Sequence, residues 1–198
     1  MALEIFGAHL GLHSPLSKSA PANTFWSVDG ALQYGNKPIL NGAPGIFDTG
    51  TTLFGLATGK LLRDSRLQDN MYYNHLTYIL DAYNLYVNAT GAIFDNRTGF
   101  LRIDADQYDN LQSLYFNIED RTFEFNANAQ IWPRKLTHLI GGKKGHIYLI
   151  VNDLGPDLSQ ETGFVAGMAF LERFYAVFDS RRHRVCLANT QFTNSTIN

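Results

Sequence analysis

The chain has 198 residues, of which 45% are apolar, 13% aromatic and 17% charged. This composition is typical of one globular domain with a hydrophobic core, and it excludes intrinsic disorder. The formal net charge of −2 excludes a strongly basic surface for nucleic acid or anionic lipid. No apolar run reaches the roughly 18 residues that a membrane span needs. Cys186 is the only cysteine, so we expect no internal disulfide. No Cys/His cluster has the spacing of a zinc site, so we expect no metal, and we expect no cofactor either.

Short runs of aromatic and β-branched residues predict a mainly β domain. In chain order, the expected strands cover 24–28, 31–34, 45–47, 99–103, 113–118, 122–125, 146–151, 175–178 and 184–188. Asp29-Gly30 lies between the first two strands and predicts a tight hairpin turn. Two short helices are expected, one over 105–113 capped by Asp104 and one over 169–174. The stretch 60–86 has loosely helical leucine spacing but is long for a connection inside a compact β domain.

Residues 1–14 read as an atypical N-terminal extension. Met1-Ala-Leu-Glu4 lacks the basic region with which a signal peptide begins. Three N-glycosylation sequons nevertheless begin at Asn88, Asn96 and Asn194, and such triplets matter only in the secretory pathway. A secretory sequence without a signal peptide predicts that the chain is a piece of a longer protein.

The strongest local motif is Asp48-Thr49-Gly50-Thr51-Thr52, which follows the apolar run Ile46-Phe47. An apolar strand here ends abruptly in a carboxylate, and Gly50 lets the backbone turn so that the carboxylate stands on a loop. The threonine hydroxyls can hydrogen-bond the backbone and hold that loop rigid. The alternative interpretation of the tripeptide alone is an ordinary turn, because Asp readily bonds its own backbone.

A second segment near the C-terminus points to one family. The stretch 164–179 contains Val165-Ala166-Gly167 followed by Phe170-Leu-Glu-Arg-Phe-Tyr-Ala-Val-Phe-Asp179, and the closing strand 184–188 comes after it. Together with Asp48-Thr-Gly, this order resembles the C-terminal lobe of the pepsin-like aspartic proteases. The segments 127–134, 148–155 and 170–179 are similar to the fungal polyporopepsin group of that family. The resemblance covers roughly residues 15–58 and 81–193, and we expect residues 194–198 to form a tail.

The resemblance implies a fold and a set of roles. The fold is a single mainly β lobe with a few short helices. The activity is that of a secreted or vacuolar acid endopeptidase acting on peptides or proteins. The implied catalytic residue is Asp48. The residues implied to support its loop are Thr49, Gly50, Val165, Ala166 and Gly167. The residues implied to bind substrate are Thr51, Thr52 and Phe25.

In this family each of two lobes supplies one aspartate. The two carboxylates share a proton because two like charges so close cannot both ionise. The charged carboxyl takes a proton from water, which attacks the peptide carbonyl, while the protonated carboxyl bonds the carbonyl oxygen. This chain has only one Asp-Thr/Ser-Gly triplet. A complete site therefore needs the missing N-terminal lobe or a second copy of the chain. The alternative is a truncated or mispredicted non-catalytic lobe that acts at most as a peptide-binding module.

A missing partner lobe also has a structural consequence. We expect the apolar surface around Ile46, Phe47, Leu53 and Val165 to be partly uncovered in this chain and to favour association.

Residues 59–80 interrupt the resemblance, because the family passes from the Asp-Thr-Gly loop into a short helix like the one expected from Asp81. This segment reads as a translated, unspliced intron or as a genuine insertion, forming at most a surface helix that packs weakly. Cys186 replaces the family's usual glycine and is interpreted as a buried apolar thiol, with a reactive thiol as the alternative. The six histidines and the basic run 181–184 are interpreted as solvated surface.

Overall fold

The computed structural model describes residues 12–20, 22–62, 78–159 and 162–197, which form a mainly β domain. The strands are β1 (Leu12–Pro15), β2 (Ser27–Tyr34), β3 (Lys37–Phe47), β4 (Phe54–Leu56), β5 (Lys60–Leu62), β6 (Tyr78–Leu80), β7 (Ile93–Asp95), β8 (Phe100–Asp104), β9 (Leu114–Ile118), β10 (Arg121–Phe125), β11 (His146–Leu149), β12 (Val151–Asp153), β13 (Phe164–Ala166), β14 (Phe174–Asp179) and β15 (Arg184–Asn189). The α-helices are α1 (Ala82–Thr90), α2 (Gly155–Leu158) and α3 (Met168–Leu171), and the 3₁₀ helices are η1 (Ala22–Thr24), η2 (Ala105–Asn110), η3 (Ala127–Gln130) and η4 (Arg134–Ile140).

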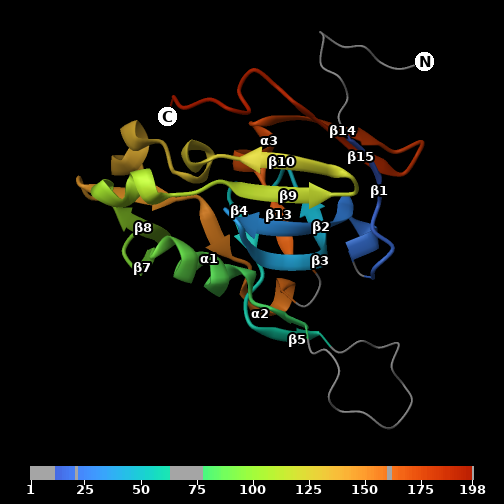
Figure 1. The fold of residues 1–198 in the computed structure, drawn as a ribbon, viewed down its shortest axis with the longest axis horizontal. Helices are drawn as coiled ribbons and strands as arrows, with labels where there is room; N and C mark the ends of the chain where they lie inside the picture. The colour runs from blue at the N-terminus through green and yellow to red at the C-terminus, as the bar shows by residue number, and fades with distance from the viewer. Residues whose placement is uncertain (1–11, 21, 63–77, 160–161, 198) are drawn as a thin grey trace.

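The largest sheet has seven strands in the order β10-β9-β2-β3-β13-β4-β12. Figure 1 shows β10, β9, β2 and β3 side by side, with β13 and β4 behind them. The strand β13 lies between two strands that are far from it in sequence. It runs parallel to β3, with Val165 opposite Ile46, and antiparallel to β4, with Val165 opposite Gly55. This insertion places the 48–53 loop, which joins β3 to β4, beside the C-terminal end of β13.

A cluster of phenylalanines fills the core against this sheet. Along β9 the buried residues alternate with half-buried ones, as expected for a strand with one face on the core. Phe116 from β9 meets Phe54, Phe164 and Phe170, at ring-centroid distances of 5.2, 5.8 and 4.8 Å. All four rings are fully buried. Such tilted and edge-to-face aromatic pairs add to the stabilisation from the buried area, so this cluster fixes the position of β13 and α3.

Two smaller sheets flank the core. In the first, β1, β15 and β14 pair in that order, and the pairing places Leu12 opposite Leu187. Residues 12–14 of the expected extension therefore belong to a strand. In the second, β11, β8 and β7 pair in that order and carry η2 and η4 at one end. Near the C-terminus, the Arg173 guanidinium donates to the carbonyl of Ser195 at 2.8 Å, which holds the tail against the domain.

The expected hairpin at Asp29-Gly30 is wrong, because β2 runs straight through both residues. The Asp29 carboxylate accepts a hydrogen bond from the Ser17 hydroxyl at 2.7 Å, and Gly30 lies opposite Ala43 of β3 and Ile118 of β9 in the sheet. The hairpin turn lies instead at Gly35, whose φ of +56° suits glycine. The polar Asp and the small Gly that suggested a turn thus serve long-range contacts.

Both expected short helices form, but they are shorter than predicted. The first is the 3₁₀ helix η2, which Asp104 and Gln107 begin with reciprocal side-chain and backbone hydrogen bonds. It ends at Asn110 because Leu111 is extended and buried in the core. The second is α3, which ends at Leu171, and β14 begins at Phe174.

The interrupting segment does not begin or end as a helix. Its ends form β5 and β6, an antiparallel pair that makes its own two-stranded sheet, while residues 63–77 lie outside the described residues. The helix expected from Asp81 is confirmed as α1. The backbone N–H of Gly59 donates to the Asp81 carboxylate at 3.2 Å, and that of Tyr83 donates to the Ala57 carbonyl at 3.0 Å. The two ends of the segment therefore lie close together.

Candidate active site

Asp48 stands on the loop after β3, at the point where the strand leaves the core. Ile46 and Phe47 are buried, whereas Asp48 is half-buried and Thr49 and Gly50 are exposed. The backbone N–H of Asp48 donates to the Ala166 carbonyl at 3.1 Å, so β13 holds the loop at its base. The apolar-to-polar change that the sequence shows at Asp48 is thus the boundary between sheet and surface.

Both carboxylate oxygens of Asp48 accept hydrogen bonds from within the loop. The Gly50 backbone N–H donates to Oδ1 at 2.8 Å, and the Thr51 hydroxyl donates to Oδ2 at 2.6 Å. These two bonds fix the orientation of the carboxylate. The Thr51 hydroxyl, which the resemblance implied would bind substrate, therefore donates a hydrogen bond to Asp48 in this structure. Thr52 is exposed beside it.

Lack of space requires a glycine at position 167, which follows β13 and packs against this loop. A Cβ on Gly167 would lie 2.3 Å from the Leu53 carbonyl oxygen and 2.4 Å from that of Thr51. The same closeness allows the Met168 N–H to donate to the Thr51 carbonyl at 2.7 Å. A Cβ on Gly50 would lie 3.2 Å from Oδ1 of Asp48. That contact is tight, but a shift of the carboxylate by a few tenths of an ångström would relieve it. Gly50 is not among the glycines with a positive φ, so the backbone here does not require glycine as the sequence suggested.

Asp48 lines a cavity of about 620 Å³, a size suited to a small ligand or a few residues of a peptide. Phe25, Thr51 and Val165 line it too, so the structure brings these sequence-predicted residues to one place. Ile46 and Phe47, the apolar run before Asp48, line it as well. The wall further contains residues outside that motif: Leu16, Asn23, Thr24, Trp26, Leu158, Thr162, Ser180 and His183. No local sequence signal marks most of these, because the wall residues come from five separate parts of the chain: 16, 23–26, 46–51, 158–165 and 180–183.

The expectation of an uncovered apolar surface around the loop is corrected in part. Ile46, Phe47 and Val165 are 8%, 3% and 6% exposed, and the rings of Phe164 and Phe170 pack against Phe47. Leu53 is half-buried. The exposed apolar side chains at this cavity are Phe25, at 49%, and Leu158, at 48%.

His183 and the basic run 181–184 form an exposed turn between β14 and β15, as the sequence predicted. The Asp179 carboxylate accepts hydrogen bonds from Arg182 at 3.3 Å and Arg184 at 3.1 Å, which ties the turn together. The backbone of His183 has a φ of +47°. The His183 carbonyl accepts a hydrogen bond from the Leu16 backbone N–H at 3.1 Å. This contact places the turn at the edge of the Asp48 cavity, which the sequence did not indicate.

Cys186 is buried, as the apolar interpretation predicted, and burial raises the pKa of its thiol. A raised pKa keeps the thiol protonated and unreactive at neutral pH. No histidine or other base capable of deprotonating the thiol was expected near Cys186 from the sequence. The pairing of β1 with β15 nevertheless brings Nδ1 of His13 to 3.1 Å from Sγ of Cys186. Among the described residues, no three His, Cys, Asp or Glu side chains gather in a way that could hold a metal ion.

The comparisons with known proteins agree with this arrangement. Residues 13–190 match the family model for eukaryotic aspartyl protease. The chain is 43% identical over 187 residues to polyporopepsin from Irpex lacteus, covering 94% of this chain and 48% of that protein. It is also similar to the crystal structure of the aspartic proteinase from Irpex lacteus, with a TM-score of 0.80 and the same two coverages. The chain thus spans about half the length of the relative that it matches. In the described part of the chain, no helix is long and apolar enough to cross a membrane.

Proposed function

Because the chain belongs to the eukaryotic aspartyl protease family, we propose that it supplies one lobe of an acid endopeptidase site, with Asp48 as the catalytic residue. The observation that carries this proposal is the position of the Asp48 carboxylate. It is fixed by the Gly50 N–H and the Thr51 hydroxyl and stands in the wall of a cavity of about 620 Å³. A rigid, accessible carboxylate is what general base catalysis requires.

The chemistry follows from pairing this carboxylate with a second one. Two carboxyl groups in close contact hold one proton between them, because full ionisation would bring two like charges together. The ionised member then takes a proton from a water molecule, and the oxygen of that water attacks the peptide carbonyl. The protonated member donates a hydrogen bond to the developing oxyanion. When this intermediate collapses, the peptide C–N bond breaks, and the amine leaves with the proton that the first carboxylate took from water. Reaction in this way needs no cofactor, and it needs acid to neutral pH because one proton must stay on the pair.

The second carboxylate is proposed to come from a lobe of the kind that makes up the other half of the relative's length, or from a second copy of this chain. Phe25 and Leu158, exposed at the cavity, would contact peptide substrate or that partner lobe. Thr49, exposed on the loop, is in a position to reach across to it.

We also propose that the full-length protein is exported, to the cell exterior or to a vacuole. The support is that all three sequon asparagines, Asn88, Asn96 and Asn194, are exposed and could carry glycans. Expression in a secreting eukaryotic host, followed by glycosidase treatment and mass measurement, tests this proposal. A mass unchanged by the glycosidase would count against it.

The catalytic proposal is tested by peptide hydrolysis at acid pH, with the chain alone and with a relative's N-terminal lobe supplied in trans. Wherever hydrolysis occurs, Asp48→Asn should lower kcat by at least about a hundredfold, the contribution typical of a general base. Asp106→Asn, an exposed carboxylate outside the cavity, is the matched control. A pepstatin-type inhibitor should bind the active assembly. Absence of hydrolysis and of inhibitor binding under both conditions would favour the non-catalytic peptide-binding lobe.

A further inference from the structure

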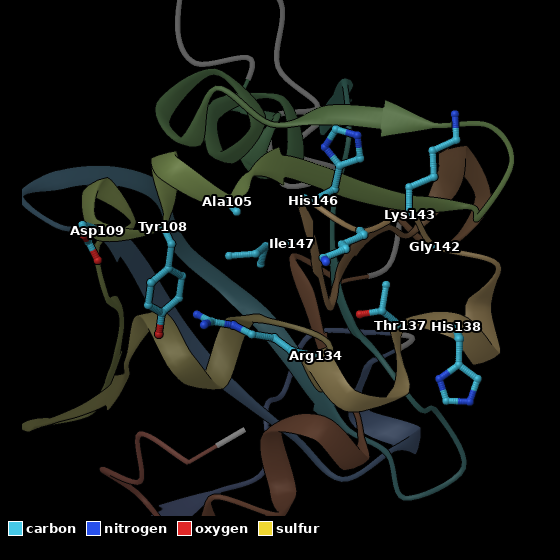
Figure 2. A pocket seen from close by; sticks show the side chains of 12 residues that line it. Ala105, Tyr108, Asp109, Arg134, Thr137, His138, Gly142, Lys143, His146 and Ile147 are labelled. Carbon is cyan, nitrogen blue, oxygen red and sulfur yellow. The ribbon is translucent and has the colours of Figure 1, made fainter.

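A second cavity of about 590 Å³ lies outside the proposed active site and shares no residue with the Asp48 cavity. Its walls come from η2, η4 and the turn leading into β11. The residues that line it are Ala105, Tyr108, Asp109, Arg134, Thr137, His138, Gly142, Lys143, Lys144, Gly145, His146 and Ile147. Figure 2 shows the η2 side chains and Arg134 at one end of this cavity and Lys143, Thr137 and His138 at the other.

Positive charge is concentrated here in a chain whose net charge is −2. Residues 125–152 contain no Asp or Glu, yet they contain Arg134, Lys135, Lys143 and Lys144. All of these except Lys135 line the cavity. The one acidic lining residue is Asp109, and Figure 2 shows its carboxylate on the far side of Tyr108 from the cationic groups.

Arg134 is held in place without losing its hydrogen-bonding capacity. Its guanidinium carbon lies 4.4 Å from the centroid of the Tyr108 ring, which is a favourable cation–π contact. Among the described residues, no carboxylate lies within ion-pair distance of Arg134, Lys143 or Lys144. These three cations are therefore not neutralised by neighbouring acids.

The turn that carries the two lysines is fixed by the backbone. The Lys143 N–H donates to the Tyr148 hydroxyl at 3.0 Å, and the Gly145 carbonyl accepts from the Ala105 N–H at 3.0 Å. Gly141 and Gly145 have φ of +70° and +90°, which shape the turn at both ends. Preorganisation of this kind lowers the entropic cost of binding a ligand.

We propose that this cavity binds a phosphate monoester or a free phosphate ion. The planar guanidinium of Arg134 matches two phosphate oxygens at once, and Lys144, which lines the same cavity, acts as a point charge against the remaining charge. Thr137 adds a hydroxyl donor at the same cavity, while Nδ1 of His146 is taken up by Asp104 at 2.8 Å. Several cations around one cavity favour a dianion over a single carboxylate, because only a dianion offsets more than one of them.

The test compares binding by isothermal titration calorimetry at about pH 7.5, where a phosphate ester carries close to two charges, at constant ionic strength. The probes are inorganic phosphate, a phosphoserine peptide and the same peptide without phosphate. The variant is Arg134→Gln with Lys144→Gln. The matched control is Lys37→Gln with Arg121→Gln, which changes the charge equally at exposed positions outside the cavity. Circular dichroism and thermal unfolding confirm that each variant folds.

The cavity variant should bind phosphate or the phosphopeptide at least about tenfold more weakly than the parent, while the control variant binds like the parent. Tighter binding of the phosphopeptide than of inorganic phosphate would assign the site to a phosphorylated protein, and the reverse order would assign it to the free ion. The proposal is overturned if neither probe binds, if the unphosphorylated peptide binds as well as the phosphopeptide, or if both variants weaken binding equally.

Discussion

Gly167→Ala tests the claim that the Asp48 loop is held by close backbone contact with the residue after β13. The added Cβ would lie 2.3 Å from the Leu53 carbonyl oxygen and 2.4 Å from that of Thr51. Both are backbone atoms, so relief of the clash requires the loop to move by about 1 Å. The hydrogen bond from the Met168 N–H to the Thr51 carbonyl, now 2.7 Å, would lengthen with it.

Overpacking of this kind costs about 1–3 kcal/mol, and the loss of one backbone hydrogen bond adds about 1 kcal/mol. We therefore expect Gly167→Ala to lower the free energy of unfolding by about 2–4 kcal/mol, measured by urea denaturation followed by circular dichroism. Gly30→Ala is the matched control, because its Cβ would meet no atom closer than 3.4 Å. That control should cost about 1 kcal/mol or less. Equal losses for the two variants would refute the reasoning.

Three further predictions concern other parts of the domain. Deleting 59–80 should change the free energy of unfolding by no more than about 1 kcal/mol, measured by urea denaturation, because the ends of the segment lie together. The pKa of Asp95 is lowered, mainly because its carboxylate accepts a hydrogen bond from the Arg97 backbone N–H. The ionised carboxylate therefore stabilises the fold above the unfolded-state pKa of about 3.9, and this stabilisation is lost as the pH falls through the lowered pKa of the folded state. Asp95→Asn should therefore flatten the decline of Tm below about pH 5. Tyr86→Phe leaves the buried Gln130 oxygen without its donor at 2.9 Å and should cost about 1–3 kcal/mol in urea denaturation.

Each of these predictions has a control or a contradicting result. A loss of several kcal/mol on deletion would show that 59–80 belongs to the core. Asp106→Asn, at an exposed position, should leave the pH dependence of Tm as in the parent, and an equal effect of Asp95→Asn and Asp106→Asn would contradict the role of Asp95. Tyr175→Phe, at a residue that is 40% exposed, should cost little, and a similar small cost for Tyr86→Phe would contradict the buried hydrogen bond.

The sequence by itself determined the family, the β class and the position of the Asp48 loop. These follow from local information: an apolar strand that ends in Asp-Thr-Gly, and contiguous segments such as 170–179 that carry a family resemblance. Short runs of aromatic and β-branched residues likewise predicted β9 and β10. Where a residue serves a distant contact, the local pattern failed, as Asp29-Gly30 shows. The pair resembles a turn, but Asp29 accepts a hydrogen bond from Ser17 and Gly30 pairs with β3 and β9.

Only the tertiary structure decided what surrounds those residues. The insertion of β13 between β3 and β4 explains why Gly167 must lack a Cβ, and β13 lies more than 100 residues along the chain from both strands. The tertiary structure also decided that His183 lies at the edge of the Asp48 cavity. It likewise decided that Tyr108, Arg134 and Lys144 line one cationic cavity. Cavities and close approaches depend on how strands pair across the chain, and strand pairing is set by long-range packing that no local stretch of sequence contains.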